Sequence, residues 1–175
     1  MAITRLGVNN ISNSTIANIT ALPAAIPTGK ILQVQTAALT TEVTSNSTTN
    51  VDVGSLSITP TSSSSTILIQ SMNHIYIPQN TGWKGALINI KRGSTSIFDD
   101  YGDQGYGESV NFTDGSNDRV MIYHNVSYVD SPNTTSATTY TVQMHSKDGT
   151  ANITINKSTY GGQGRLTLME IAGWL

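Results

Sequence analysis

Histidines are the residues of this sequence best suited to acid–base or metal chemistry, and it has three of them, His74, His124 and His145. Each lies in the middle of a segment whose pattern predicts a β-strand, and no two are spaced as metal ligands are. A histidine in a strand is more often a core or cross-strand partner than a ligand. We therefore predict no metal site.

Nucleophile chemistry has equally little support. The chain has no cysteine, no Gly-x-Ser-x-Gly turn of a serine hydrolase and no Gly-rich phosphate loop followed by lysine. The serine run at 62–65 is typical of a turn, and a serine hydroxyl without a neighbouring base is not a nucleophile at neutral pH. The sequence therefore predicts a non-enzymatic protein that needs no cofactor.

Acidic and aromatic residues gather in and beside one long Gly-rich segment, residues 99–118. Paired carboxylates can serve a glycosidase or hold Ca²⁺, but these spacings match no calcium loop, and acids on loops are usually just solvated. Aromatic faces beside polar groups suit contact with a carbohydrate or a protein surface; the alternative is that the rings fill the end of the domain. The candidate contact residues are Trp83, Asp99, Asp100, Tyr101, Asp103, Tyr106 and Asn111.

Strand patterns must position these residues, because no segment shows a helical period. The longest strong run is Thr66–Ile77, and Asp148-Gly149 predicts a hairpin that brings Ile153 and Ile155 back against Tyr140–Ser146. About nine regularly spaced strands predict an all-β fold, a single antiparallel β-sandwich that is jelly-roll-like. The other expected strands are Ile31–Val43, Val51–Ile58, Ala86–Arg92, Thr95–Phe98, Arg119–Val129 and Arg165–Ala172.

The first 29 residues differ from the rest. Their large apolar residues are spaced irregularly among Asn, Ser and Thr, and Pro23 and Pro27 argue against a long helix. We predict an extended N-terminal arm over residues 1–29 that docks on its own domain or on a partner, followed by the sandwich over residues 30–175. The anchoring residues of the arm are Ile11, Ile16, Ile19, Leu22 and Ile26.

Charge is scarce, at 11% of the 175 residues compared with about 25% in an average domain. No Lys or Arg lies between Ile31 and Trp83, so this stretch lacks a common guard against strand association and favours coverage by neighbouring subunits; a Ser/Thr-coated soluble surface is the alternative. A net charge of −2 without a cluster of cations excludes typical nucleic-acid binders. No apolar run is long enough for membrane insertion.

Five segments carry a resemblance to a known family. They are the Gly-Lys-Ile-Leu-Gln-Val opening at 29–34, the Pro- and Ser-rich segment at 57–65, the charged hairpin at 90–95, the Tyr-Val-Asp-Ser-Pro stretch that leads to Tyr140, and the closing Leu-Met-Glu-Ile-Ala-Gly at 168–173. In these segments the chain resembles a family of tailed-bacteriophage virion proteins, common in marine phages, in which a tail-fibre-like β-sandwich ends a longer chain.

The resemblance implies a homotrimeric virion surface protein, made in the cytoplasm of the bacterial host, whose partners are other tail or capsid proteins. As a tail-fibre-like knob it would contact a bacterial surface glycan or protein through the loop at 99–118. The alternatives are a capsid decoration or cement protein and, from another class, a free carbohydrate-binding module. We expect the stretch from Ile31 to Trp83 and the closing strand Arg165–Ala172 to carry the subunit contact.

Overall fold

The computed structural model describes residues 30–78, 82–99, 108–112 and 119–172. These residues form eleven strands and one short 3₁₀ turn, η1, at Ser158–Tyr160. No helix among them is long and apolar enough to cross a membrane. The strands are β1 (Ile31–Leu39), β2 (Val43–Ser45), β3 (Val51–Ile58), β4 (Thr66–Ile77), β5 (Gly82–Arg92), β6 (Thr95–Asp99), β7 (Glu108–Phe112), β8 (Val120–Asp130), β9 (Thr138–Ser146), β10 (Ile153–Ile155) and β11 (Gly164–Ile171).

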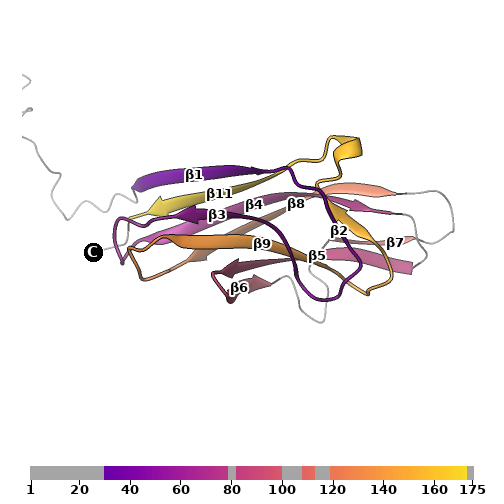
Figure 1. Cartoon of the computed structure of the whole chain (residues 1–175), viewed down its shortest axis with the longest axis horizontal. Helices are drawn as coiled ribbons and strands as arrows, with labels where there is room; N and C mark the ends of the chain where they lie inside the picture. Colours follow the sequence, from indigo (N-terminus) through magenta and orange to yellow (C-terminus); the bar gives the residue numbers. More distant parts are fainter. Residues whose placement is uncertain (1–29, 79–81, 100–107, 113–118, 173–175) are drawn as a thin grey trace, which may run out of the picture.

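The strands form two antiparallel sheets that pack face to face (Figure 1). The six-stranded sheet has the order β1-β11-β4-β10-β2, with β8 on the other side of β4. The five-stranded sheet has the order β3-β9-β5-β6, with β7 also paired to β5. Four principal strands, β1-β11-β4-β8, therefore face β3-β9-β5-β6, and the chain repeatedly crosses between the sheets. This is the strand order of a jelly roll, and the predicted fold class is confirmed.

The core lies between the sheets and follows from the alternation of side chains along each strand. Strand β4 contributes four fully buried isoleucines that point toward the five-stranded sheet: Ile67, Ile69, Ile75 and Ile77. They pack against Ile, Val and Met side chains of β5 and β9. Burying one such side chain contributes about 1.5–3 kcal/mol. Repeated across both sheets, this burial stabilises the fold without a disulfide.

The prediction of a hairpin at Asp148-Gly149 is wrong. Strand β9 lies in the five-stranded sheet, whereas β10 crosses to the six-stranded sheet and pairs with β2 and β4. The reason is the edge of β4: β11 covers it only from Thr66 to Met72, and β10 pairs with Ile75 and Tyr76 beyond that point. Backbone groups of β4 that would otherwise lack a partner are thereby satisfied.

Some boundaries also differ from those expected. The segment 31–43 divides into β1 and the start of β2, which lie at opposite ends of the strand order. Strand β5 begins at Gly82 rather than Ala86, and β7 lies inside the expected loop at 99–118. The glycines and acids of that stretch conceal the alternation that identifies a strand from sequence. The arm at 1–29 lies outside the described residues.

Candidate functional site: the outer face of the six-stranded sheet

An apolar row crosses the solvent-facing side of the six-stranded sheet. The antiparallel register places Val34 of β1 beside Met169 of β11, Met169 beside Leu68 of β4, and Leu68 beside Val129 of β8. Ile31 and Ile171 form a second pair at the end of the sheet where the described chain begins. We call these six residues the apolar belt: Ile31, Val34, Leu68, Val129, Met169 and Ile171.

The belt is open to solvent. Ile31, Val34 and Val129 are 54%, 52% and 53% exposed, and Leu68, Met169 and Ile171 are half-buried. An antiparallel sheet with one solvated face normally carries polar residues there. Single exposed apolar side chains are ordinary, whereas a contiguous set across four strands marks an interaction surface.

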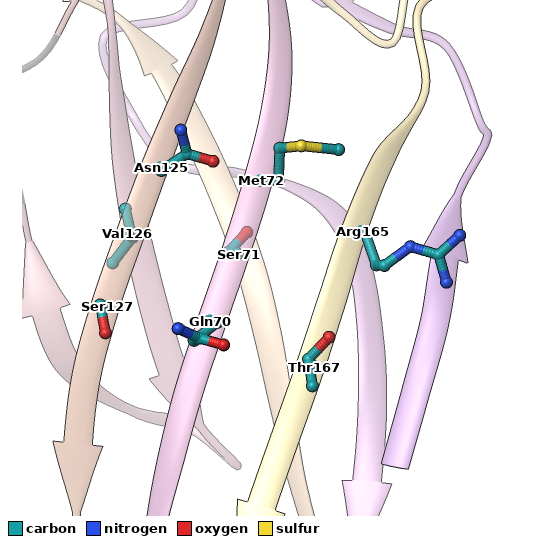
Figure 2. A pocket seen from close by; sticks show the side chains of 8 residues that line it. All are labelled: Gln70, Ser71, Met72, Asn125, Val126, Ser127, Arg165 and Thr167. Atoms are coloured by element: carbon teal, nitrogen blue, oxygen red, sulfur yellow. The ribbon is translucent and has the colours of Figure 1, made fainter. Parts of the chain in front are cut away.

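The rows beyond the belt are more polar, although Met72 in the second of them is 37% exposed. Thr36, Thr167, Gln70 and Ser127 form the next row, and Ala38, Arg165, Met72 and Asn125 form the one after it. The residues of these rows on β4, β8 and β11 line a shallow depression of about 330 Å³ (Figure 2). Within these rows Arg165 is the one charged side chain, and its guanidinium donates to the Thr36 hydroxyl at 3.3 Å. Amides and hydroxyls, which both donate and accept hydrogen bonds, make up most of the remaining surface.

Aromatic rings at the far end of this face serve the fold. Tyr76 of β4 stacks on Tyr160 of η1 with ring centroids 5.5 Å apart, Arg119 lies over Tyr160, and Lys157 lies over Tyr76. Glu42 binds Lys157 at 2.8 Å, and hydrogen bonds from Lys157 and Ser158 lower the pKa of this carboxyl group to about 2. The stacked rings fix η1 onto the sheet, so their faces are covered by protein groups.

The outer face of the five-stranded sheet has the opposite character. Lys91 binds Asp52 at 2.9 Å, Gln143 donates to the same carboxylate at 2.5 Å, and Asn89 donates to Gln143 at 2.6 Å and accepts from Ser96 at 2.5 Å. The hydrogen bonds from Lys91 and then Gln143 lower the pKa of Asp52. This polar network satisfies its own members, and the side chains that the structure describes on this face form no apolar row comparable to the belt.

The structure describes only some of the predicted contact residues. Trp83 of β5 and Asn111 of β7 are register partners, so these two positions do lie side by side. Asp99 ends β6, is exposed, and borders a second depression of about 530 Å³ that His145 and Lys147 also line. The remaining candidates lie outside the described residues, as do the arm residues: Asp100, Tyr101, Asp103, Tyr106, Ile11, Ile16, Ile19, Leu22 and Ile26.

Three of the segments that carry the family resemblance meet at one buried carboxylate. Glu170, in the closing segment, is 0% exposed and accepts from the Gln33 amide at 2.7 Å and from the backbone N–H and hydroxyl of Thr61, each at 2.7 Å. Burial raises the pKa of this carboxyl group, but the hydrogen bonds from Gln33 and Thr61 outweigh burial and hold the pKa at about 2. This network joins β1, the loop before β4, and β11.

The other two segments meet at Asp130, which joins the two sheets. Arg92 of β5 donates to both oxygens of Asp130, at 2.7 and 2.9 Å, and the buried Tyr140 of β9 donates its hydroxyl at 2.7 Å. Burial and then the hydrogen bond to Asp130 raise the pKa of Tyr140. The segments that carry the resemblance therefore hold the fold together, and they also supply five of the six belt residues.

No protein-family model and no curated protein matches the chain. Among solved structures it is similar to dimeric latent PorU from Porphyromonas gingivalis, with a TM-score of 0.41 and 7% identity over 86% of this chain and 14% of that one. It is also similar to a protein of infectious bursal disease virus strain Gt, with a TM-score of 0.37 and 9% identity over 82% of this chain and 39% of that one. The VP2 subviral particle of the same virus gives a TM-score of 0.36 and 12% identity over 81% and 38%.

The chain thus spans less than two fifths of the length of each of these neighbours. Viral capsid proteins are among them, but TM-scores below 0.5 carry no argument about the function of this chain. The jelly-roll assignment rests on the strand order itself.

Sequence reasoning expected the subunit contact in stretches that carry most of the belt, but it did not identify the belt itself. A signal was present: Ile67, Leu68 and Ile69 are consecutive, as are Leu168 and Met169, so both faces of β4 and β11 carry apolar side chains. A half-buried strand alternates apolar with polar residues, and the breakdown of alternation marks a second contact face. Only the register shows that these positions align with Val34 and Val129.

Proposed function

We propose that this chain is a non-enzymatic surface protein of a tailed-phage virion, a small trimeric tail-fibre-like knob. In this proposal the arm docks on the particle and the sandwich contacts a glycan or protein of the bacterial surface. The observation that carries the proposal is the apolar belt, a contiguous exposed surface beside two rows that carry a single charge, Arg165. The family resemblance supplies the class of particle.

The use of the carboxylates supports a role without catalysis. Glu42, Asp52, Asp130, Asp148 and Glu170 each accept hydrogen bonds that hold neighbouring segments together. A catalytic carboxylate instead needs a free oxygen directed at a substrate. These five groups are therefore committed to structure.

Location on the particle tests the proposal. Antibodies raised against the purified chain, with colloidal gold as the label, are applied to intact virions in the electron microscope. We expect gold at the tail, and particles that lack the gene for this chain are the control. Gold over the head would replace the knob with the alternative of a capsid decoration protein, and virions without gold would refute a role on the virion surface.

A separate experiment tests whether the chain is an enzyme. The combined variant D99N/D100N/D103N/E108Q removes the acids of the expected contact loop, and we expect it to retain the fold and its incorporation into virions. Purified wild-type chain is incubated with polysaccharide from the host, and new reducing ends are measured. Release of reducing ends by the wild type that is lost in the variant would show that the protein is an enzyme.

A further inference from the structure

We propose that the depression on the outer face of the six-stranded sheet binds an acidic saccharide, a sugar unit that carries a carboxylate. The inference rests on the proposed function, in which the sandwich contacts the bacterial surface, and it gives that contact a place and a class of ligand. The depression lies on β4, β8 and β11, in the two rows next to the apolar belt (Figure 2).

The polar side chains of the depression are open to a ligand. Four of them line it, and none forms a hydrogen bond with another group among the described residues: Gln70, Asn125, Ser127 and Thr167. On the outer face of the five-stranded sheet, by contrast, the amides bond to one another and to a carboxylate. Hydroxyl and amide groups both donate and accept hydrogen bonds, as the hydroxyls of a sugar do, so the depression and a sugar match in several orientations.

Arg165 gives the depression a positive charge that no described carboxylate neutralises. It is the one charged side chain that β1, β4, β8 and β11 direct to solvent, and its 3.3 Å hydrogen bond to the Thr36 hydroxyl is its one interaction with another described side chain. Figure 2 shows this side chain extending from β11 on the side away from β4, so that its stem borders the depression. A guanidinium holds a carboxylate through two parallel hydrogen bonds, which are stronger than a bond to a hydroxyl. A ligand with a carboxylate therefore has an advantage over a neutral one.

The depression has the size of a small-molecule site. Its volume of about 330 Å³ lies at the lower end of the range of about 300–1,000 Å³ for such sites. Two strand spacings separate β11 from β8, so the depression is about 10 Å wide. Tyr123 follows on the same face of β8, about 7 Å beyond Asn125. This tyrosine is 53% exposed, and its ring packs against that of His74 with centroids 5.1 Å apart. A ring with an apolar face and a hydroxyl suits the face of a sugar, so the site fits a mono- or disaccharide.

An extended peptide is a poorer fit than a saccharide. The face of a sheet presents side chains, so a peptide laid on it covers its own backbone N–H and C=O groups, which need partners at fixed spacings. The two rows offer amides and hydroxyls about 7 Å apart along the strands rather than a ladder of backbone groups. A sugar has no backbone to satisfy, and its hydroxyls lie around the rim of its ring, where these side chains can reach them.

Titration calorimetry with the full chain tests this inference. The probes are oligosaccharides of galacturonate, mannuronate and sialic acid, and each is compared with the neutral form made by reducing its carboxyl groups. We expect at least one acidic probe to bind, its neutral form to bind more weakly by about tenfold or more, and the variant R165Q to show the same loss with the acidic probe. The control K30Q removes the same charge from an exposed residue about 26 Å along β1 from Ala38, the partner of Arg165, and its affinity should stay within about twofold of the wild type. Circular dichroism checks that both variants are folded.

Three calorimetric outcomes would overturn the inference. The first is that no acidic probe binds. The second is an equal loss in R165Q and K30Q, which would reduce the effect to general attraction between charges. The third is that triglutamate binds as tightly as the sugars, which would indicate a peptide ligand.

Amide NMR shifts of the chain locate the site independently of affinity. Changes on binding should centre on Gln70, Asn125 and Tyr123, and changes confined to other parts of the chain would overturn the inference. These results are distinct from the gold-labelling result. Gold on the tails of virions without saccharide binding would refute this site alone, whereas saccharide binding by a chain that is absent from virions would refute the role on the virion alone.

Discussion

The buried carboxylate of Glu170 gives the sharpest test of how the sandwich is held together, through the variant E170Q. The side chain is 0% exposed, and its two oxygens accept three hydrogen bonds of 2.7 Å from Gln33 and Thr61. Glutamine keeps the shape but turns one acceptor oxygen into a donor NH₂. That group then faces either the Gln33 amide or the Thr61 N–H, both of which are donors.

The expected cost follows from these contacts. A hydrogen bond to a charged group contributes about 1.5–3 kcal/mol, and E170Q removes at least one outright and removes the charge from the others. Rotation of the Gln33 amide recovers part of the loss but breaks its 2.7 Å bond to the Thr59 carbonyl. We expect the free energy of unfolding at pH 7 to fall by about 2–3 kcal/mol, which lowers Tm by roughly 4–12 °C for a chain of this size.

The pH dependence gives the second half of the test. The pKa of Glu170 is about 2 in the folded protein, below the value of about 4.3 for an unperturbed Glu. A group with a depressed folded pKa contributes stability that is fully present above the unfolded pKa and is lost as the pH falls through the folded pKa. The difference between wild type and E170Q should therefore be full at pH 6–7 and should shrink from about pH 4.3 toward pH 2.

Urea unfolding followed by circular dichroism at pH 7, 4 and 2.5 measures both effects. E42Q is the matched control, because Glu42 has the same depressed pKa and similar hydrogen-bond partners but is only half-buried, so solvent screens its contribution and its loss should be smaller. A loss at E170Q no greater than at E42Q, or a difference that is the same at pH 2.5 as at pH 7, would refute this account of Glu170.

Three further outcomes are expected. Y140F removes the hydroxyl that donates to Asp130 and should lower the free energy of unfolding in urea by about 1–2 kcal/mol; an unchanged midpoint would contradict a role in joining the sheets. G164A places a Cβ 2.7 Å from the Met72 carbonyl oxygen across the β11–β4 pair and should cost about 1–3 kcal/mol, and a Tm equal to that of the wild type would show that the strands yield freely. Deletion of residues 2–26 should leave the melting transition unchanged and should abolish attachment to virions that lack the chain. The reason is that burying a few apolar side chains, at about 1.5–3 kcal/mol each, roughly offsets the backbone entropy of ordering the arm, about 1–2 kcal/mol per residue. Normal attachment, or an unfolded product, would exclude an anchoring arm.

Strand type and position could be predicted where alternation is strong. The expected strands Val51–Ile58 and Thr66–Ile77 coincide with β3 and β4 because most core positions of each carry Ile, Leu or Val. Which strands pair with each other was harder to predict from the sequence. The Asp148-Gly149 turn is a strong local signal, yet β10 pairs with β2 and β4, because the open edge of β4 is a feature of the assembled sheet and not of the local sequence.

The candidate site, too, could be predicted from the sequence only in part. The scarcity of charge between Ile31 and Trp83 drew attention to this stretch, and three belt residues come from it. Val129 could not be added from sequence, because its place beside Leu68 depends on the register of β8 against β4. The roles of Gln33 and Thr61 were hidden for a similar reason: both are common residues whose importance comes from meeting Glu170.

The pairing of β1 with β11 has a consequence for the life of the chain in the cell. The register joins Ile31 to Ile171 and Leu39 to Gly164, so the first described strand has its sheet partner only after more than a hundred further residues are made. At about 5–20 residues per second, translation takes roughly 6–30 s to supply that partner. Until then the apolar belt is incomplete, because Met169 and Ile171 are not yet in place. In the proposed role, in which copies associate, a nascent chain on the ribosome would not yet offer this surface to finished neighbours.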